Sequence, residues 1–319
     1  MAVDTPIIDA HHHLWVDPPF PQFPTFPIEQ LASLRAGSGY DIRATVFVDC
    51  LREYLTDGPE ELRPIGETRA VEAEAAAASG GPADGIAAAI VGQADMRLGG
   101  GVEHVLRAHL EESPTRFRGI RHMTPWFPGM SFFDLPIDEH MLCTPAFAQA
   151  LAVLAKLDLT FDAWVLSTQL HDVVELARAV PEATIVLNHA GTPMGVGPWE
   201  GRADEVFSLW RDGMAAVAGC PNVVVKLGGL LMHVTGLVPH GLDRPMNADE
   251  VATALRRYVR TAIELFGPDR CMFESNFPVD GMFVSYADLW AGFDLITADL
   301  TRAERASLFA GTAAGTYRL

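Results

Sequence analysis

Residues 7–13 read Ile-Ile-Asp-Ala-His-His-His, and this stretch decides between the two folds that the rest of the chain allows. Two isoleucines begin it, and β-branched residues favour a strand. Three histidines end it, at the place where an open, doubly wound sheet usually carries a glycine-rich turn. We therefore expect a strand that presents polar side chains at its C-terminal end, and no nucleotide-binding turn after it.

The rest of the chain repeats the same alternation of short and long elements. Further β-rich runs follow at residues 44–50, 86–95, 117–123, 159–165, 184–190, 223–229 and 271–277. Helical stretches are expected at residues 67–79, 102–112, 147–157, 170–180, 204–218, 248–266, 286–297 and 302–310. Alternation of this kind predicts βαβ units and a parallel sheet. Eight units predict one (β/α)8 barrel over residues 1–319, with catalytic groups at the C-terminal ends of its strands.

The composition and net charge of the chain restrict the kinds of molecule that it is expected to bind. The chain of 319 residues holds 23 Lys and Arg against 41 Asp and Glu, which gives a formal net charge of −18. Nucleic acids and anionic membrane surfaces bind chiefly through basic side chains, so neither is expected as a partner. A small anionic substrate in a locally basic pocket remains compatible with this charge. Four scattered cysteines, no leader-like start and no apolar run of about 18 residues together predict a cytoplasmic protein.

Two loops rich in proline and aromatic residues are expected over the barrel mouth. They cover residues 16–27 and 124–136, after the first and fourth strands. Loops in this place usually shape a substrate pocket, although packing on the barrel rim would explain the same composition. Exposed aromatic loops are also compatible with a homo-oligomer.

The candidate site begins with the histidines of the first strand. Side chains alternate along a strand, so His11 and His13 should share a face with Asp9, while His12 faces away. Two imidazoles at such a spacing can bind one cation where the strand end twists. His189 adds a third imidazole at the end of the run at residues 184–190. The other histidines outside the strands are expected at the surface, namely His104, His109, His140 and His171.

The order of these motifs resembles the amidohydrolase superfamily of barrel hydrolases. Within it, the chain is similar to the amidohydrolase-2 group, which includes sugar lactonases, a pyrone-dicarboxylate lactonase and some decarboxylases. The stretches that carry the resemblance are IIDAHHHLW, ATVFVDC, GETRAVEAEAAAASG, FRGIRHM, LTFDAWV, TIVLNHAGTP, VVVKLGGL, CMFESNFPVD and FAGTAAGTYRL. The resemblance implies that His11 and His13 are metal ligands, or polarise the substrate in metal-free members. It implies that His189 is the histidine that the group carries on its sixth strand.

The chain departs from the group's pattern in two places. The bridging lysine and the fifth-strand histidine of two-metal members have no counterpart, so we expect at most one divalent ion on His11, His13 and His189. Zinc is the first choice, and a metal-free route stays open. Where the group has Ser-Asp-x-Pro, this chain has Asn276. An amide cannot accept a proton near neutral pH. Either the base is another group, with Asp280, Glu274 and His189 as candidates, or the chemistry differs from that of the group.

Basic and amide side chains near the strand ends are candidates for substrate binding. Arg121 offers a planar fork that suits a carboxylate. Lys226 stands at the end of a strand that should be buried, where an unpaired ammonium is costly. It would therefore bind a substrate carboxylate or polarise a carbonyl, or else form a structural ion pair. His122, Trp126 and Gln169 are further candidates for the pocket.

These features predict a hydrolase that opens a small, polar, carboxylated substrate by water attack, with a lactone as the first choice. A non-oxidative decarboxylase on the same barrel is the alternative, because the group contains such enzymes. A non-catalytic binding protein is a second alternative, and Asn276 is the residue that favours it.

Overall fold

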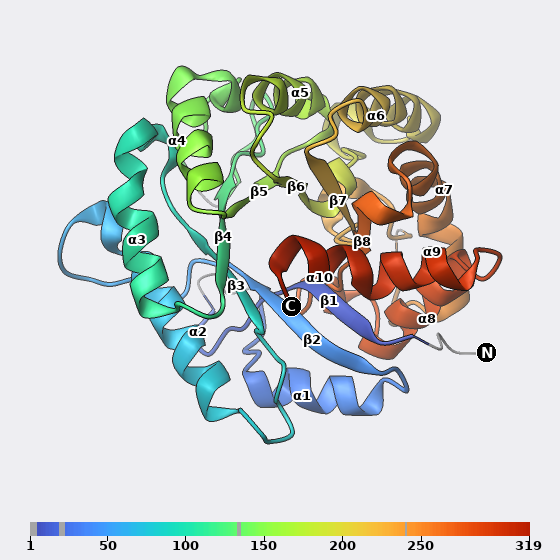
Figure 1. Cartoon of the computed structure of the whole chain (residues 1–319). Helices are drawn as coiled ribbons and strands as arrows, with labels where there is room; N and C mark the ends of the chain where they lie inside the picture. Colours follow the sequence, from blue (N-terminus) through green and yellow to red (C-terminus); the bar gives the residue numbers. More distant parts are fainter. Residues whose placement is uncertain (1–4, 19–22, 133–134, 240) are drawn as a thin grey trace.

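The computed structural model describes residues 5–18, 23–132, 135–239 and 241–319. In this part of the chain, eight parallel strands form one sheet (Figure 1). Each strand pairs with the next one in chain order. This topology confirms the (β/α)8 barrel, because an open doubly wound sheet reverses its strand order. The strands are β1 Ile7–His12, β2 Ile42–Val48, β3 Ala89–Gln93, β4 Phe117–Met123, β5 Thr160–Trp164, β6 Ile185–Leu187, β7 Val223–Leu227 and β8 Cys271–Phe273.

Helices surround the barrel and follow the predicted order with one addition. They are α1 Ile28–Gly37, α2 Ile65–Ala77, α3 Glu103–Glu112, α4 Pro145–Lys156, α5 Leu170–Ala179, α6 Ala203–Ala218, α7 Ala248–Phe266, α8 Tyr286–Ile296, α9 Arg302–Ala306 and α10 Thr312–Tyr317. The sequence analysis did not predict α1, which begins after Pro27 without a side-chain cap. The helix predicted at residues 302–310 continues through a π-helical turn, Ser307–Gly311, into α10.

The barrel closes between its first and last strands, beyond the end of β8. The backbone N–H of His13 donates to the carbonyl of Phe277 at 2.7 Å, and the N–H of Asn276 donates to the carbonyl of His11 at 2.9 Å. The seam of the barrel is therefore formed by the backbone of the predicted site residues themselves.

Asp9 does not share a face with the site histidines, contrary to the expected alternation. The pairing of β1 with β2 is irregular between Asp9 and His12, so the strict period of two fails there. The Asp9 carboxylate accepts from the backbone N–H of Ser275 at 2.7 Å and from the Tyr286 hydroxyl of α8 at 2.9 Å. Burial raises the pKa of Asp9 to about 6. Asp9 thus joins β1 to the segment after β8 and takes no place beside the imidazoles.

The interior of the barrel is filled by small and branched side chains, and α10 covers one end of it (Figure 1). Ala313 and Tyr317 of α10 pack in the same buried cluster as inward-facing residues of β1, β2 and β3. A larger apolar layer lies between the strands and the helices. Of the helices in the described ranges, none is long and apolar enough to cross a bilayer.

Candidate active site

Two imidazoles from β1 and the residue after it meet at the end of the strand. The Nε2 atoms of His11 and His13 lie 3.3 Å apart. The Nδ1 atom of His13 lies 2.8 Å from the Val48 carbonyl, which can only accept, so Nδ1 carries the proton and Nε2 keeps its lone pair. Burial lowers the pKa of both rings well below the usual range, helped by the charge of Lys226 at His11 and of Arg121 at His13. Both rings are therefore neutral near pH 7 and able to act as ligands.

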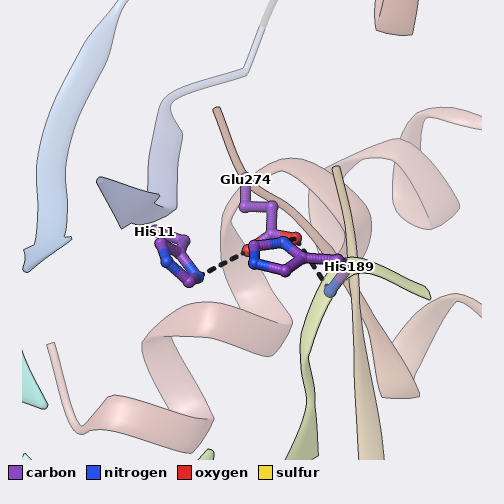
Figure 2. A group of neighbouring side chains, drawn as sticks. All are labelled: His11, His189 and Glu274. Atoms are coloured by element: carbon purple, nitrogen blue, oxygen red, sulfur yellow. Dashed lines mark hydrogen bonds and ion pairs between the residues drawn. The ribbon is translucent and has the colours of Figure 1, made fainter. Parts of the chain in front are cut away.

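Glu274 lies between His11 and His189 and orients both rings (Figure 2). Its Oε1 accepts from the backbone N–H of His189 at 3.1 Å and contacts Nδ1 of the same ring at 2.8 Å. Its Oε2 lies 2.9 Å from Nδ1 of His11. Neither Nδ1 of His11 nor Oε2 of Glu274 makes a directed hydrogen bond, although both atoms are buried. The carboxylate thus directs the Nδ1 edges of both rings toward itself.

His189 stands in a left-handed turn and not in a strand. β6 ends at Leu187, whereas the sequence predicted a strand to residue 190, and His189 has a φ of 53°. Gly229, which follows β7 with a φ of 62°, faces this ring: a Cβ there would lie 2.0 Å from Nδ1 of His189. A Cβ on Gly228 would lie 2.2 Å from the backbone oxygen of Glu274. The glycine pair in VVVKLGG was the signal in the sequence for this close approach.

Asn276 faces the cavity at the end of β8, and Asp280 lies behind it. The Asn276 amide donates to Oδ1 of Asp280 at 2.9 Å, and the N–H of Leu231 donates to Oδ2 at 3.3 Å. Burial raises the pKa of Asp280 to about 8. Neither Asp280 nor Glu274 lines the cavity. Of the three candidate bases, His189 is the one that reaches it.

The cavity at the strand ends has a volume of about 250 Å³. Ligand pockets commonly measure about 300–1,000 Å³, so this one suits a small molecule. Its described lining consists of His13, Trp15, Phe23, Cys50, Leu51, Arg121, Met123, Phe132, Trp164, His189, Met232, His233, Val234, Asn276, Val279 and Met282. Phe23 and Phe132 come from the two predicted aromatic loops, of which residues 19–22 and 133–134 lie outside the described residues.

Arg121 brings a fixed positive charge to the floor of this cavity. Its Nη2 donates to the Asp49 carbonyl, and its Nη1 lies 3.5 Å from Nε2 of His11. Its Nε is buried without a hydrogen-bond partner. The guanidinium carbon lies 5.8 Å from the centre of the Trp164 ring. The fork is held in place and retains an unused donor.

Three of the predicted substrate-binding residues, His122, Trp126 and Gln169, are not among the described residues that line this cavity. His122 alternates with Arg121 on β4, so its side chain points outward. Its ring centre lies 5.2 Å from that of Phe147, and its Nδ1 accepts from the backbone N–H of Met96 at 3.1 Å. The Gln169 amide oxygen accepts from the N–H of Trp126 at 2.8 Å. Its amide nitrogen donates to the carbonyl of residue 124 at 2.8 Å, so it joins two loops. The described contacts of His122 and Gln169 thus favour a structural role for these two side chains.

Lys226 also lies away from the cavity, below the floor inside the barrel. Its Nζ lies 2.6 Å from Oδ2 of Asp162, and both side chains are fully buried. The Tyr317 hydroxyl donates to Oδ1 of the same carboxylate at 3.0 Å, and the ammonium lies 5.3 Å from the Tyr317 ring centre. The structural ion pair, one of the two alternatives for Lys226, is the one that forms.

The imidazole cluster fits a single divalent ion. His11, His189 and Glu274 each offer a donor atom, and these atoms lie within 4.8 Å of one another. With Zn–N bonds of about 2.0–2.1 Å, two nitrogens in a tetrahedral site lie about 3.3 Å apart. The Nε2 atoms of His11 and His13 show a separation of 3.3 Å. The charge of Arg121 beside His11 opposes a cation there, so the donors fit an ion while one neighbour competes with it.

The imidazoles lie at the C-terminal ends of the strands, which is where the active sites of (β/α)8-barrel enzymes lie. The chain belongs to the amidohydrolase family, whose profile matches residues 8–319. An uncharacterised protein of Sinorhizobium fredii is 32% identical over 99% of both chains. An L-fucono-1,5-lactonase of Burkholderia multivorans is 28% identical over 98% of this chain and 96% of its own. The crystal structure of a zinc-bound amidohydrolase from B. multivorans aligns over 98% of this chain and 99% of its own, with a TM-score of 0.74 and 26% identity. The resemblance seen in the sequence is confirmed.

Proposed function

We propose that this hydrolase opens a lactone ring by water attack in the cavity at the barrel mouth. The observation that carries the proposal is the cavity floor, where His13, His189 and Arg121 face one space of about 250 Å³. The similarity to a lactonase of B. multivorans over nearly the whole chain supports a cyclic ester as the substrate.

Each floor residue has a role in this reaction. Arg121 presents a positive charge where the carbonyl oxygen becomes negative, which stabilises the transition state. His189 takes a proton from the attacking water through Nε2, while Glu274 holds Nδ1. The C–O bond of the ring then breaks, and the imidazolium returns the proton to the departing ring oxygen. The product is one hydroxy acid per lactone and water consumed. Asn276 contacts the substrate, and its amide positions the carboxyl group of Asp280.

His11 and His13 would hold one divalent ion, for which zinc is our choice. When bound, it would polarise the lactone carbonyl and lower the pKa of a water molecule. The sequence also predicted His189 as a ligand, whereas its bond to Glu274 supports the role of base. Elemental analysis of variants separates the two roles: His11→Ala and His13→Ala should lose zinc, and His189→Ala should keep zinc but lose activity. Loss of zinc from His189→Ala would make it the third ligand.

The reaction itself is tested with purified protein, a panel of lactones and a pH indicator. Lactone opening releases acid, so the indicator should report a falling pH. The decarboxylase alternative predicts CO2 release and proton uptake from carboxylated aromatic acids. A protein that turns over nothing in either panel, but gains thermal stability with one compound, would be a binding protein.

We further propose one domain over residues 1–319, a cytoplasmic location and a homo-oligomer whose only partner is its small-molecule substrate. The net charge of −18 supports the absence of a nucleic-acid partner. Light scattering on the purified protein tests the oligomer, and fractionation of cells tests the location.

A further inference from the structure

The walls of the active-site cavity differ in chemistry from its floor. Above the floor, most of the described residues of the lining are aromatic or aliphatic, and they include Trp15, Phe23, Phe132, Met232 and Val279. The walls come from loops after different strands, so the apolar character does not belong to one segment. Such a wall desolvates hydrocarbon and offers nothing to a hydroxyl group.

Two polar side-chain groups of the wall, those of Trp15 and Cys50, are already engaged by the protein. The indole N–H of Trp15 donates to the carbonyl of Cys50 at 3.2 Å, and the Cys50 thiol donates to the carbonyl of Leu14 at 3.7 Å. The Trp15 ring also stacks against the rings of His13 and Phe23, with ring centres 5.4 Å and 4.7 Å away. The lining also includes His233, which is exposed.

We infer that the substrate is a lactone substituted with hydrocarbon, and not a polyhydroxylated sugar lactone. This inference rests on the proposed function. The ester group meets the polar floor, where His13, His189 and Arg121 lie, and the substituent meets the wall. The hydroxyl groups of a sugar would lose their bonds to water against the aromatic and aliphatic side chains of this wall, and these side chains offer them no hydrogen bond in return.

The test compares δ-octalactone, which carries a propyl group, with L-fucono-1,5-lactone and D-glucono-δ-lactone. We expect kcat/KM for δ-octalactone to exceed that for either sugar lactone at least tenfold. A sugar lactone that reacts equally well or better would overturn the inference while leaving the lactonase function intact. If no lactone reacts, the proposed function fails. Calorimetry with the matching lactams then decides the inference: tighter binding of the propyl lactam supports it, and equal or weaker binding refutes it.

Two isosteric variants examine the wall itself. Val234→Thr and Val279→Thr each place a hydroxyl where a methyl group lined the cavity. Each should lower kcat/KM for δ-octalactone about threefold to tenfold relative to the sugar lactones. Val16→Thr is the matched control, because Val16 is 51% exposed and does not line the cavity. Wall variants that behave like this control would contradict the inference.

Discussion

Two buried polar clusters lie inside this barrel, and they differ in how completely their atoms are paired. Below the floor, Lys226, Asp162 and Tyr317 are engaged with one another and closed off from the cavity. At the floor, Nε of Arg121 is buried without a hydrogen-bond partner. A buried polar group that lacks a partner costs stability unless a ligand supplies one. Unused bonding capacity beside a cavity therefore separates the functional cluster from the structural one.

The largest effect that we expect is a loss of stability when the cluster below the floor is broken. Lys226→Met removes one member of a buried pair and leaves the Asp162 charge uncompensated, which should cost about 3–5 kcal/mol of unfolding free energy. Urea unfolding at neutral pH measures this loss. The double variant with Asp162→Asn should recover most of it, because no charge is left unpaired. A stable Lys226→Met protein that has lost only activity would place the lysine in the substrate site.

His109 is another fully paired polar group, and it makes stability depend on pH. It is buried, with contacts to the Thr68 hydroxyl at 2.8 Å and the Gln93 carbonyl at 2.9 Å. Burial lowers its pKa from 6.5 to about 4. Between these pH values the unfolded chain binds a proton that the folded chain refuses. The unfolding free energy should therefore fall by about 3 kcal/mol as the pH falls through this window.

The measurement for His109 is a series of urea titrations between the two pH values. His109→Gln should flatten the dependence relative to the native protein. His104→Gln on the same helix is the control, because the His104 side chain is 54% exposed and should not change the slope. Equal slopes for all three proteins would show that His109 titrates normally.

At the cluster on the cavity floor, we expect substitutions to lower catalytic activity more than they lower the free energy of unfolding. His13→Ala removes a ring that lines the cavity, and we expect kcat/KM for a lactone to fall about a hundredfold, or about 2.7 kcal/mol. His12→Asn tests the opposite face of the same strand, where Nε2 contacts the Thr45 hydroxyl at 2.8 Å. It should lower the unfolding free energy and leave kcat/KM within about threefold. Similar losses of activity in both variants would remove the distinction between the two faces.

The smallest effect concerns Asn276 and the divalent ion. Asn276→Asp adds a charged oxygen ligand at the cavity, so zinc affinity should rise about tenfold, which is about 1.4 kcal/mol. Competition with a chelator measures this change. Asn276→Ser serves as the uncharged control and should not raise the affinity. No difference between the two variants would show that this side chain does not approach the ion.

Local patterns were enough to predict the barrel and the residues that end its strands. The eight β-rich runs each correspond to a strand, and the motif around His11 and His13 placed both rings together. Alternation along β4 explains why Arg121 reaches the cavity and His122 does not, and the same rule was available from the sequence. Strand ends were less certain, as the early end of β6 before His189 shows.

Contacts between distant segments could not be read in the same way. Asp9 left its expected face because the register of β1 against β2 is irregular. His109 was expected at the surface, but it is buried between α3 and the strands. The orienting role of Glu274 depends on two rings that are far from it in sequence, and the partner of Lys226 lies 64 positions away. Such pairings arise from three-dimensional packing and leave no local signal.

The seam of the barrel has a consequence for how this protein is made. The carbonyl of His11 accepts a hydrogen bond from the N–H of Asn276, so the imidazoles near the start of the chain are fixed by residues near its end. A ribosome-bound chain of which β1 to β7 have left the ribosome contains the histidines but does not yet contain the segment that holds them. Catalysis therefore begins only after synthesis has passed the eighth strand, and the appearance of activity reports completed closure.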